Sequence, residues 1–398
     1  MKKITLLTTK YSDNKKDAWL TNELAYSLRD DGHIVSVVVF SWLPNEPETR
    51  VKKIDGINVV RVKLPKIMYN KNMFFTALKM FLFPQVAKWH VHKNIKECDL
   101  LITNTPCVTI LGLSNFFKNK FNSKTYLVCW DFFPFYLKDL SLIRNKLVFK
   151  IFHYLEEKMY RSFSKIGCMT KGNINFLLKN FPTVDKDKIQ VLPLWAKTKY
   201  LLPIDVSMTR KKYNLPQDAT IVVYGGAMSV VQELTNYIDL ARESLNLDKK
   251  ILFLLIGNGT EKTKLEKIVA DEQLDNVMFI NYVPRDEYEN VVRACDIGFI
   301  SLSRKLTVPS FPSKSLDYFK ASLPILASLD AVTDFGSILE NEIKAGLSVL
   351  AGDTESLLSK LDILVSDRKL RTELGKAGRI YYENYLTVDY AKKMILET

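Results

Sequence analysis

The stretch FPSKSLDYFKASLPILAS, from Phe311 to Ser328, contains one step of an α/β fold: a loop, then a helix, then a strand. Pro312 and Ser313 mark the start of the helix, and we expect Ser313 to cap it. Lys314 then falls in the first helical turn, where the helix dipole disfavours a cation. A lysine in this place is either solvated at the surface or the partner of an anion bound at that helix end.

The same step recurs along the chain, because short apolar, β-branched runs alternate with amphipathic segments of helix length. In the first half, strands are expected at 3–9, 34–40, 57–63, 99–103, 125–129, 165–170 and 188–193. In the second half, strands are expected at 220–224, 251–257, 276–280, 296–302, 324–328 and 346–350. Strands that are apolar nearly throughout and separated by helices indicate parallel sheets covered on both faces.

The pattern restarts near residue 220, after a loop rich in proline and lysine at 193–218. We therefore expect two doubly wound α/β domains facing a cleft, one formed by residues 1–197 and the other by 198–375. Ligands of such sheets bind beyond the carboxyl ends of the strands.

The positive charge belongs entirely to the first half. The chain has 57 Lys+Arg and 44 Asp+Glu, a net charge of +13. Residues 1–197 hold 32 Lys+Arg and 16 Asp+Glu, a net charge of +16. Residues 198–398 hold the remaining 25 Lys+Arg and 28 Asp+Glu, a net charge of −3. A basic half predicts an anionic partner: a nucleic acid, an acidic membrane surface or a phosphorylated acceptor.

Two aromatic and basic stretches lie in this half. Residues 74–93 are too often interrupted, by Lys79, Pro84 and Lys88, for a membrane span of about 20 apolar residues. They are typical of an interfacial segment, as are residues 132–155. Each stretch fits an ordinary core helix with outward lysines equally well, but two in the basic half favour membrane contact. The basic start of residues 1–13 has too short an apolar run for a signal peptide and is interpreted as the first strand.

Cysteine and histidine spacings predict no metal site. The cysteines at 98, 107, 129, 168 and 295 form no CxxC pair, which is typical of buried, reduced thiols in a cytosolic protein. The histidines at 33, 90, 92 and 153 also lack the spacing of zinc ligands.

Two glycine turns directly follow strands of the second half. In YGGAMSVVQEL (224–234), Gly225 and Gly226 precede a helix, so a ligand can approach the backbone and the helix N–H groups can meet an anion. Gly257 and Gly259 follow the next strand in the same way. Tight packing at the first turn, and an ordinary strand-to-helix connection at the second, explain these glycines equally well.

The third turn carries Lys314, which follows the strand at 296–302. Its ammonium group and the helix N–H groups can bind one diphosphate together. Asp317, one turn further on, can accept hydrogen bonds from a ribose diol, or it can simply favour the helix start. Because the three turns meet at one sheet edge, they form a candidate site.

Several segments, in order and spacing, resemble one enzyme family. The chain resembles the GT-B fold glycosyltransferases of family 4, retaining enzymes that use nucleotide-sugar donors, and is most similar to the bacterial branch that builds O-antigen, capsule and related polysaccharides. The similar segments are LTNELAYSLRDDGHIVSVV (20–38), CWDFFP (129–134), LEEKMYRSFSKIGCMTKGNINFL (155–177), IGNGTEKTKLEK (256–267), NVMFINYVPRDEYENVVRACDIGFISL (276–302), PSKSLDYFKASLPILAS (312–328), GLSVLAGDTESLLSKL (346–361) and LGKAGRIYYENYL (374–386).

This resemblance implies roles for the candidate residues. Lys314 and the Ser313 backbone would hold the donor diphosphate, and Asp317 stands where the family usually has a ribose-binding glutamate. The remaining donor-side positions, which line the diphosphate turns or the edge of the base pocket, are Gly225, Gly226, Gln232, Gly257, Gly259 and Val283.

The resemblance also assigns the domains. Residues 1–197 would bind the acceptor, 198–375 the donor, and the C-terminal helices at 376–398 would pack back onto the first domain. Asp131 would face the donor sugar or the acceptor as a catalytic group, although an aspartate that caps a turn fits this position equally well.

The chain departs from the family at several positions. Pro309 stands in place of the first of two glutamates, so the group that meets the donor sugar there is not given by the sequence. Ser322 replaces a usual glycine and Leu194 a common asparagine, and TTKYSDNKK (8–16) replaces a glycine-rich loop.

These observations predict a retaining, metal-independent glycosyltransferase, cytoplasmic and peripheral on the inner face of the bacterial cell membrane. Its donor would be a nucleotide-diphosphate sugar and its acceptor a polysaccharide or lipid-linked oligosaccharide. A sugar-nucleotide epimerase of the same fold is an alternative that would act on the donor alone. A nucleic-acid-binding protein is another, but no nucleic-acid module appears and the basic residues are interleaved with long apolar side chains.

Overall fold

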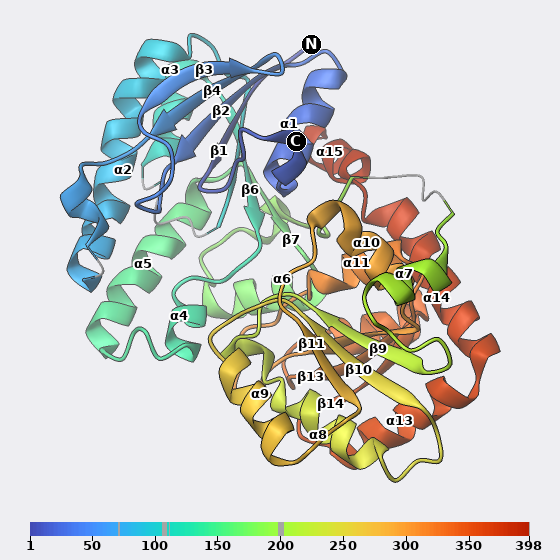
Figure 1. The fold of residues 1–398 in the computed structure, drawn as a ribbon. Coiled ribbons are helices and arrows are strands. Elements are labelled where there is room, and N and C mark those ends of the chain that lie inside the picture. Colours follow the sequence, from blue (N-terminus) through green and yellow to red (C-terminus); the bar gives the residue numbers. More distant parts are fainter. Residues whose placement is uncertain (71, 106–109, 111, 198–202, 398) are drawn as a thin grey trace. The chain divides into compact units, whose positions relative to one another are not determined.

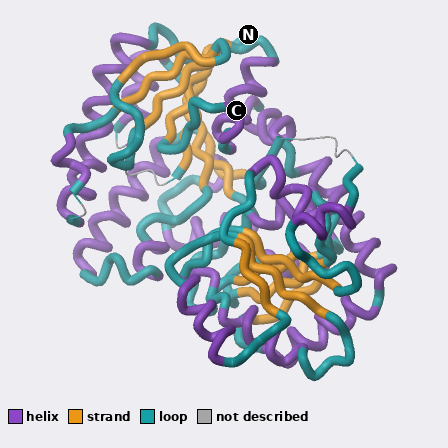
Figure 2. The backbone as a smooth tube through the Cα atoms, in the orientation of Figure 1, coloured by secondary structure: helices purple, strands orange, loops and turns teal. Residues whose placement is uncertain are grey.

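The computed structural model describes residues 1–398 except 71, 106–109, 111, 198–202 and 398. The chain forms two compact units (Figures 1 and 2). The first unit contains Met1–Lys197 and Thr387–Thr398, and the second contains Thr198–Leu386.

The sheet of the first unit has the order β3-β4-β2-β1-β5-β6-β7-β8 over the described residues. Its strands are β1 (Lys3–Thr8), β2 (Ile34–Phe40), β3 (Arg50–Ile54), β4 (Ile57–Val62), β5 (Leu100–Asn104), β6 (Lys124–Cys129), β7 (Lys165–Cys168) and β8 (Ile189–Val191). All pair in parallel except β3, which is antiparallel to β4. The sequence did not predict β3, because this edge strand is mostly exposed and has no apolar run.

Helices cover both faces of this sheet (Figure 1). They are α1 (Leu20–Asp30), α2 (Met73–Asn94), α3 (Leu113–Phe121), α4 (Phe135–Asp139), α5 (Lys146–Ser162), α6 (Lys171–Asn180) and α15 (Val388–Leu396), with short 3₁₀ turns η1 (Lys15–Asp17), η2 (Lys66–Tyr69) and η4 (Lys186–Lys188). Leu24 and Leu28 of α1 share one core with Ala391 and Ile395 of α15. The last helix therefore completes the first unit.

The second unit has a parallel sheet of order β11-β10-β9-β12-β13-β14 over its described residues. Its strands are β9 (Thr220–Gly225), β10 (Ile251–Ile256), β11 (Val277–Ile280), β12 (Ile297–Ser301), β13 (Ile325–Leu329) and β14 (Gly346–Leu350). The helices are α7 (Val206–Lys212), α8 (Thr235–Ser244), α9 (Lys262–Asp271), α10 (Arg285–Arg293), α11 (Lys314–Lys320), α12 (Phe335–Ser337), α13 (Thr354–Ser366) and α14 (Arg368–Tyr385), with η5 (Val230–Gln232) and the π-helical turn η6 (Ile338–Ile343). The predicted α/β class with two parallel sheets is confirmed.

The chain returns to the first unit at Thr387, later than the expected residue 376. Helix α14 stays in the second unit, because its glycines allow it to lie close to neighbouring atoms. A Cβ atom at Gly375 would lie 2.0 Å from the carbonyl oxygen of Ser322, and one at Gly378 would lie 2.6 Å from the Phe319 ring. The first backbone bond of the returning segment joins the Val388 N–H to the Ala196 carbonyl at 3.1 Å.

The strand order of the second sheet reverses between β9 and β12, since the chain adds β10 and β11 on one side and β13 and β14 on the other. In doubly wound sheets, ligands bind at this switch point, beyond the carboxyl ends of the strands. The loops that follow β9 and β12 are therefore the first place to look for a site.

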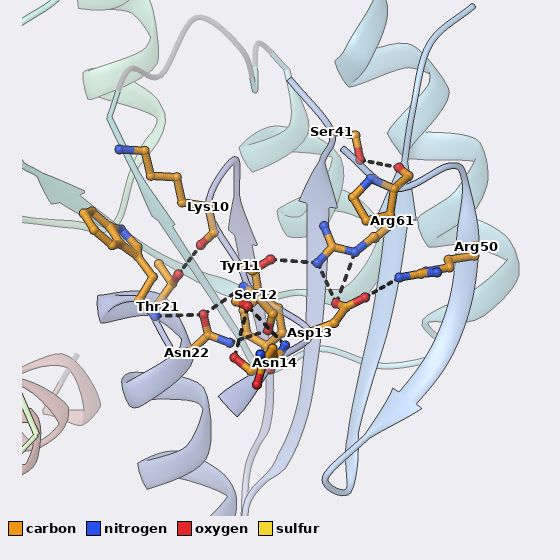
Figure 3. A network of polar contacts seen from close by, with 12 residues as sticks. Lys10, Tyr11, Ser12, Asp13, Asn14, Thr21, Asn22, Ser41, Arg50 and Arg61 are labelled. Carbon is orange, nitrogen blue, oxygen red and sulfur yellow. Dashed lines mark hydrogen bonds and ion pairs between the residues drawn. The ribbon is translucent and has the colours of Figure 1, made fainter. Parts of the chain in front are cut away.

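The loop after β1 is held by a polar network in the first unit (Figure 3). The Asp13 carboxylate pairs with Arg50 and with the buried Arg61, at 2.6 Å for the second pair. Asn22, also fully buried, accepts hydrogen bonds from the N–H groups of Ser12 and Trp19 at 3.0 and 3.1 Å and donates to the Ser12 carbonyl at 2.8 Å. The segment TTKYSDNKK thus has a defined shape despite having no glycine.

Replacing Asn22 by alanine is expected to destabilise the first unit by about 2 kcal/mol, because three hydrogen bonds at a buried site are lost at about 0.7 kcal/mol each. For a unit of this size, that corresponds to a melting temperature lower by about 5 °C, which differential scanning calorimetry of the full chain would measure. Asn119→Ala, at an exposed position of α3, is the control. An unchanged transition in Asn22→Ala would show that the network does not hold the loop.

Further expectations concern cysteines and membrane spans. Cys98, Cys129, Cys168 and Cys295 are buried free thiols, as expected, and Cys107 lies outside the described residues. Among the helices of the described residues, none combines the length and the apolar character needed to cross a bilayer.

Candidate functional site

Three turns lie side by side at the carboxyl edge of the second sheet, after β9, β10 and β12. Backbone hydrogen bonds connect two of them: the Gly226 N–H donates to the Ile256 carbonyl at 2.9 Å, and the Met228 N–H donates to the Asn258 carbonyl at 2.9 Å. The Ser303 N–H of the loop after β12 donates to the Val231 carbonyl of the loop after β9 at 2.9 Å. The turns therefore form one continuous backbone layer.

Lys314, the first residue of α11, reaches this layer from the loop after β12. Its Nζ donates a hydrogen bond to Gln232 Oε1 at 2.9 Å and lies 5.0 Å from the centroid of the Tyr224 ring. The side chain is half-buried, so Lys314 is not a solvated surface lysine. Residues from the loops after β9 and β12 thus surround one ammonium group at the switch point.

The environment of Lys314 lowers its pKa to about 8, because removal of the ammonium group from water disfavours the charged form, while the nearby Asp317 carboxylate acts in the opposite direction. The hydrogen bond to Gln232 and the Tyr224 ring supply neutral partners and no counter-charge. A bound anion would supply the missing charge. This arrangement is suited to a phosphate group.

The glycines of these turns make room for protein atoms. Gly226 has φ +134°, and a Cβ atom there would lie 2.9 Å from Lys314 Cε. A Cβ atom at Gly225 would lie 1.9 Å from the Tyr288 hydroxyl oxygen. Gly257 has φ +135°, and a Cβ atom there would lie 2.2 Å from the Gly226 carbonyl oxygen. A Cβ atom at Gly259 would lie 2.1 Å from the Met228 carbonyl oxygen. Tight packing therefore accounts for the glycines, and the approach of a ligand to them stays a prediction.

The start of α11 differs from the expected capped helix end. Ser313 has helical dihedral angles, is exposed, and its side chain caps no N–H group, so that prediction is wrong. A tight turn satisfies the donors instead: the N–H groups of Ser315 and Leu316 donate to the carbonyls of Pro312 and Ser313 at 3.0 and 3.2 Å. An anion at this place would depend on the Lys314 ammonium more than on these N–H groups.

The other donor-side residues lie around this centre. Asp317 is exposed in the first turn of α11. Val283, expected at the base pocket, is 7% exposed after β11, while its neighbour Tyr282 is 76% exposed. Pro309 is buried in the loop after β12. The nucleotide roles of Asp317 and Val283 stay predictions.

Two tyrosines at the site were not predicted. Tyr224 lies beneath the Lys314 ammonium and donates a hydrogen bond to the Ala227 carbonyl at 2.6 Å. Tyr288 of α10 places its hydroxyl against Gly225. A polar-tipped aromatic immediately before a Gly-Gly pair was the available sequence signal for Tyr224; nothing in the sequence singled out Tyr288.

The loop after β12 is further held by Glu233. Burial acts to raise the pKa of this carboxyl, but hydrogen bonds from Arg304 and Ser303 outweigh it, so the pKa lies below the usual value. The Arg304 N–H donates at 2.8 Å and its Nε at 2.7 Å. This ion pair fixes the path of the loop that delivers Lys314.

The pKa of Lys314 predicts how anion binding changes with pH. Below pH 8 the ammonium is charged, and above it the charge is lost, so the affinity for a nucleoside diphosphate is expected to fall by up to about tenfold per pH unit above pH 8. Calorimetric Kd values between pH 7 and 9.5 would measure this. Lys314→Arg, whose guanidinium stays charged, is the control and should remove most of the fall. An identical fall in both proteins would exclude Lys314 as its cause.

Asp131 lies in the first unit, directly after β6. Its side chain is exposed, and its N–H donates to Thr105 Oγ1 at 2.9 Å. The neighbouring strand ends line a small cavity of about 10 Å³, with Asn104 and Trp130 among its lining residues. Asn104 Oδ1 and Trp130 Nε1 are buried there and find no hydrogen-bond partner among the described residues. A cavity of this size has room for about one water molecule, which would satisfy both atoms. Asp131 as a catalytic group stays a prediction.

Among the described residues, no group of three or more His, Cys, Asp or Glu side chains is placed to hold a metal ion. An Asp-x-Asp sequence does occur at Asp185–Asp187, in and before η4. Its first carboxylate accepts a hydrogen bond from the Asp187 N–H at 3.0 Å and so caps the 3₁₀ turn.

Comparisons with known proteins show what this chain is similar to. Residues 205–381 match the family model of glycosyl transferases group 1. This group 1 match includes the three turns, Lys314 and Gln232. A putative colanic acid biosynthesis glycosyl transferase, WcaI of Escherichia coli K12, is 24% identical over 179 residues; the alignment covers 44% of this chain and 44% of WcaI.

Two solved structures show the fold of the whole chain. WaaG, a glycosyltransferase involved in lipopolysaccharide biosynthesis, has a TM-score of 0.69 and 15% identity, covering 99% of this chain and 100% of WaaG. HepE of Anabaena in complex with UDP has a TM-score of 0.69 and 13% identity, covering 99% and 98%. The chain thus has the GT-B fold.

Proposed function

We propose that this chain is a glycosyltransferase that moves a sugar from a nucleoside-diphosphate sugar to a polysaccharide or lipid-linked oligosaccharide during synthesis of a bacterial surface polysaccharide. The observation that carries this proposal is the Lys314 ammonium, held by Gln232 and Tyr224 beside the turns of the switch point. The group 1 match over the same unit and the names of the related proteins support it.

In the proposed reaction, the bond from the sugar C1 to the phosphate oxygen breaks and a bond to the acceptor hydroxyl oxygen forms on the same face, so the anomeric configuration is retained. The departing diphosphate gains negative charge and takes up the acceptor proton. Lys314 contacts the diphosphate and stabilises this charge more strongly in the transition state than in the bound donor, which is what catalysis requires.

The remaining donor contacts follow from the positions around Lys314. Asp317, exposed one turn along α11, accepts hydrogen bonds from the ribose. Val283 and its surroundings border the base. The charge of Lys314 takes the part that a metal ion plays in other transferases, so activity should persist in the presence of a chelator such as EDTA.

The acceptor would bind to the first unit, beyond the carboxyl ends of β5 and β6, near Asp131 and Trp130. A lipid-linked acceptor would bring the chain to the inner face of the cell membrane. The net charge of +16 on residues 1–197 suits an anionic membrane surface.

A thermal-shift screen against UDP-, GDP- and dTDP-sugars tests the proposal, because a ligand that binds only the folded state raises the melting temperature. One nucleotide series is expected to stabilise the chain, and the stabilisation should be much smaller in Lys314→Met. Product analysis with the stabilising donor alone distinguishes the alternatives: conversion to an epimer without acceptor would replace transfer by epimerisation.

A further inference from the structure

Exposed apolar side chains lie in the connection after α4 and on the outer face of α5. We call this the α4–α5 surface; its members and their exposed fractions are Leu140 (39%), Leu142 (52%), Leu147 (66%), Ile151 (51%) and Tyr154 (63%). Leu147, Ile151 and Tyr154 follow one another at spacings of four and three residues, which places them on one face of the helix.

This face is not needed to pack α5 onto its own unit. The opposite side of the helix already does so, because Met159 and Tyr160 are buried and Phe152 and Leu155 pack on Phe133. Helix α5 therefore has two apolar faces, one of which remains in water. Large apolar side chains gathered on an exposed face indicate an interaction site.

The exposed charges around the surface are positive, whereas Asp139 and Glu157, which flank it, are half-buried. Residues 140–155 contain Arg144, Lys146 and Lys150, all exposed, and no Asp or Glu. Helix α2, whose Met80 packs in the same cluster as Phe152 of α5, continues the pattern. Residues 56–96, which include α2, hold eight Lys and Arg and no Asp or Glu. The exposed side chains of this surface therefore favour an occupant that is both apolar and anionic.

We propose that the α4–α5 surface docks the chain onto a lipid bilayer with anionic headgroups. Leu147, Ile151 and Tyr154 enter the boundary between headgroups and acyl chains, and Lys146 and Lys150 pair with lipid phosphates. The helix lies in the interface without crossing the bilayer. This inference rests on the proposed function, since an acceptor carried on a lipid has to be met at the membrane.

Vesicle flotation of the full chain tests the proposal. Wild-type protein should float with vesicles of phosphatidylglycerol and phosphatidylcholine at low salt, and less with phosphatidylcholine alone. The double variant Leu147→Glu/Ile151→Glu should bind at least about tenfold more weakly, because acidic groups replace inserting side chains. The control Leu350→Glu/Ile363→Glu changes two residues of similar exposure, 61% and 47%, in the second unit and should float like wild type.

A second pair separates local from overall charge. Lys146→Glu/Lys150→Glu should weaken flotation, whereas Lys369→Glu/Lys376→Glu, with the same charge change at exposed positions of α14, should not. Three results would each contradict the docking surface. They are a wild-type protein that does not float, a Leu147→Glu/Ile151→Glu variant that floats like wild type, and control variants that lose as much flotation as the variants they are paired with. A lower mass of Leu147→Glu/Ile151→Glu in size-exclusion chromatography, with unchanged flotation, would instead show an interface with a second copy.

The donor-dependent thermal shift, measured on the same proteins, keeps this proposal separate from the proposed function. A variant that no longer floats but keeps the donor shift supports the docking surface. A wild-type chain that floats as expected but shows no donor shift would contradict the proposed function and not the surface.

Discussion

Lys314→Met is expected to lower turnover by at least about a hundredfold and to weaken nucleoside-diphosphate binding. Loss of one preorganised charged donor at a developing anion typically costs about 10²–10³ in rate. The Lys314 ammonium lies at the switch point, and its hydrogen bond to Gln232 at 2.9 Å holds it in place. Methionine preserves the length and the apolar stem of the side chain.

The same substitution should not harm the fold. An ammonium group partly removed from water is a cost to stability, as its pKa of about 8 indicates, so the melting temperature of Lys314→Met should be equal to or above that of wild type. Opposite effects on activity and stability are what a functional lysine predicts. Lys305→Met, at an exposed position of the same loop, is the control and should leave both unchanged. Wild-type turnover in Lys314→Met would remove Lys314 from the mechanism.

Gly257→Ala should have the largest effect on stability, about 3 kcal/mol or more, together with loss of donor binding. The added Cβ atom would lie 2.2 Å from the Gly226 carbonyl oxygen, and both atoms belong to backbone that hydrogen bonds hold in place. The turn after β9 must therefore move, and the Gly226 segment on which the Lys314 stem rests moves with it. Thermal unfolding and nucleotide titration would measure the two losses.

Gly32→Ala separates the clash from the backbone strain. Gly32 also has a positive φ, +82°, but an added Cβ atom meets nothing within 4 Å. Its alanine variant should cost only about 1 kcal/mol, the conformational part alone. Equal losses in the two variants would mean that contact between the turns after β9 and β10 contributes nothing.

The elements that could be predicted from the sequence are those with strong local patterns. The strands after which the site turns lie are nearly continuous apolar runs, and such runs identify buried parallel strands without tertiary information. Strand β3 has no such run, because Arg50–Ile54 lies at a solvated edge and is positioned by pairing with β4. The point where the chain leaves the second unit depends on which residues Gly375 and Gly378 touch, and those contacts lie far away in the sequence.

The sequence predicted which residues form the candidate site better than it predicted which atoms those residues contact. The position of Lys314 after a strand and at a helix start indicated the switch point. Its bond to Gln232, 82 residues away, depends on the paths of two loops, one of which is fixed by Glu233 and Arg304. The glycine turns suggested space for a ligand, whereas Tyr288 and Lys314 itself occupy that space. Side chains that fill the space beside a glycine come from distant parts of the chain, so the sequence around the glycine does not indicate them.

The central claim is that Lys314 holds the diphosphate of the donor, and the most direct measurement is a binding cycle. Kd values of the nucleoside diphosphate and monophosphate of the stabilising base are measured at pH 7 for wild type and Lys314→Met. Wild type should prefer the diphosphate by about tenfold or more, and Lys314→Met should bind both nearly equally, since a charge-assisted contact contributes about 1.5–3 kcal/mol. An undiminished preference for the diphosphate in Lys314→Met would contradict the claim.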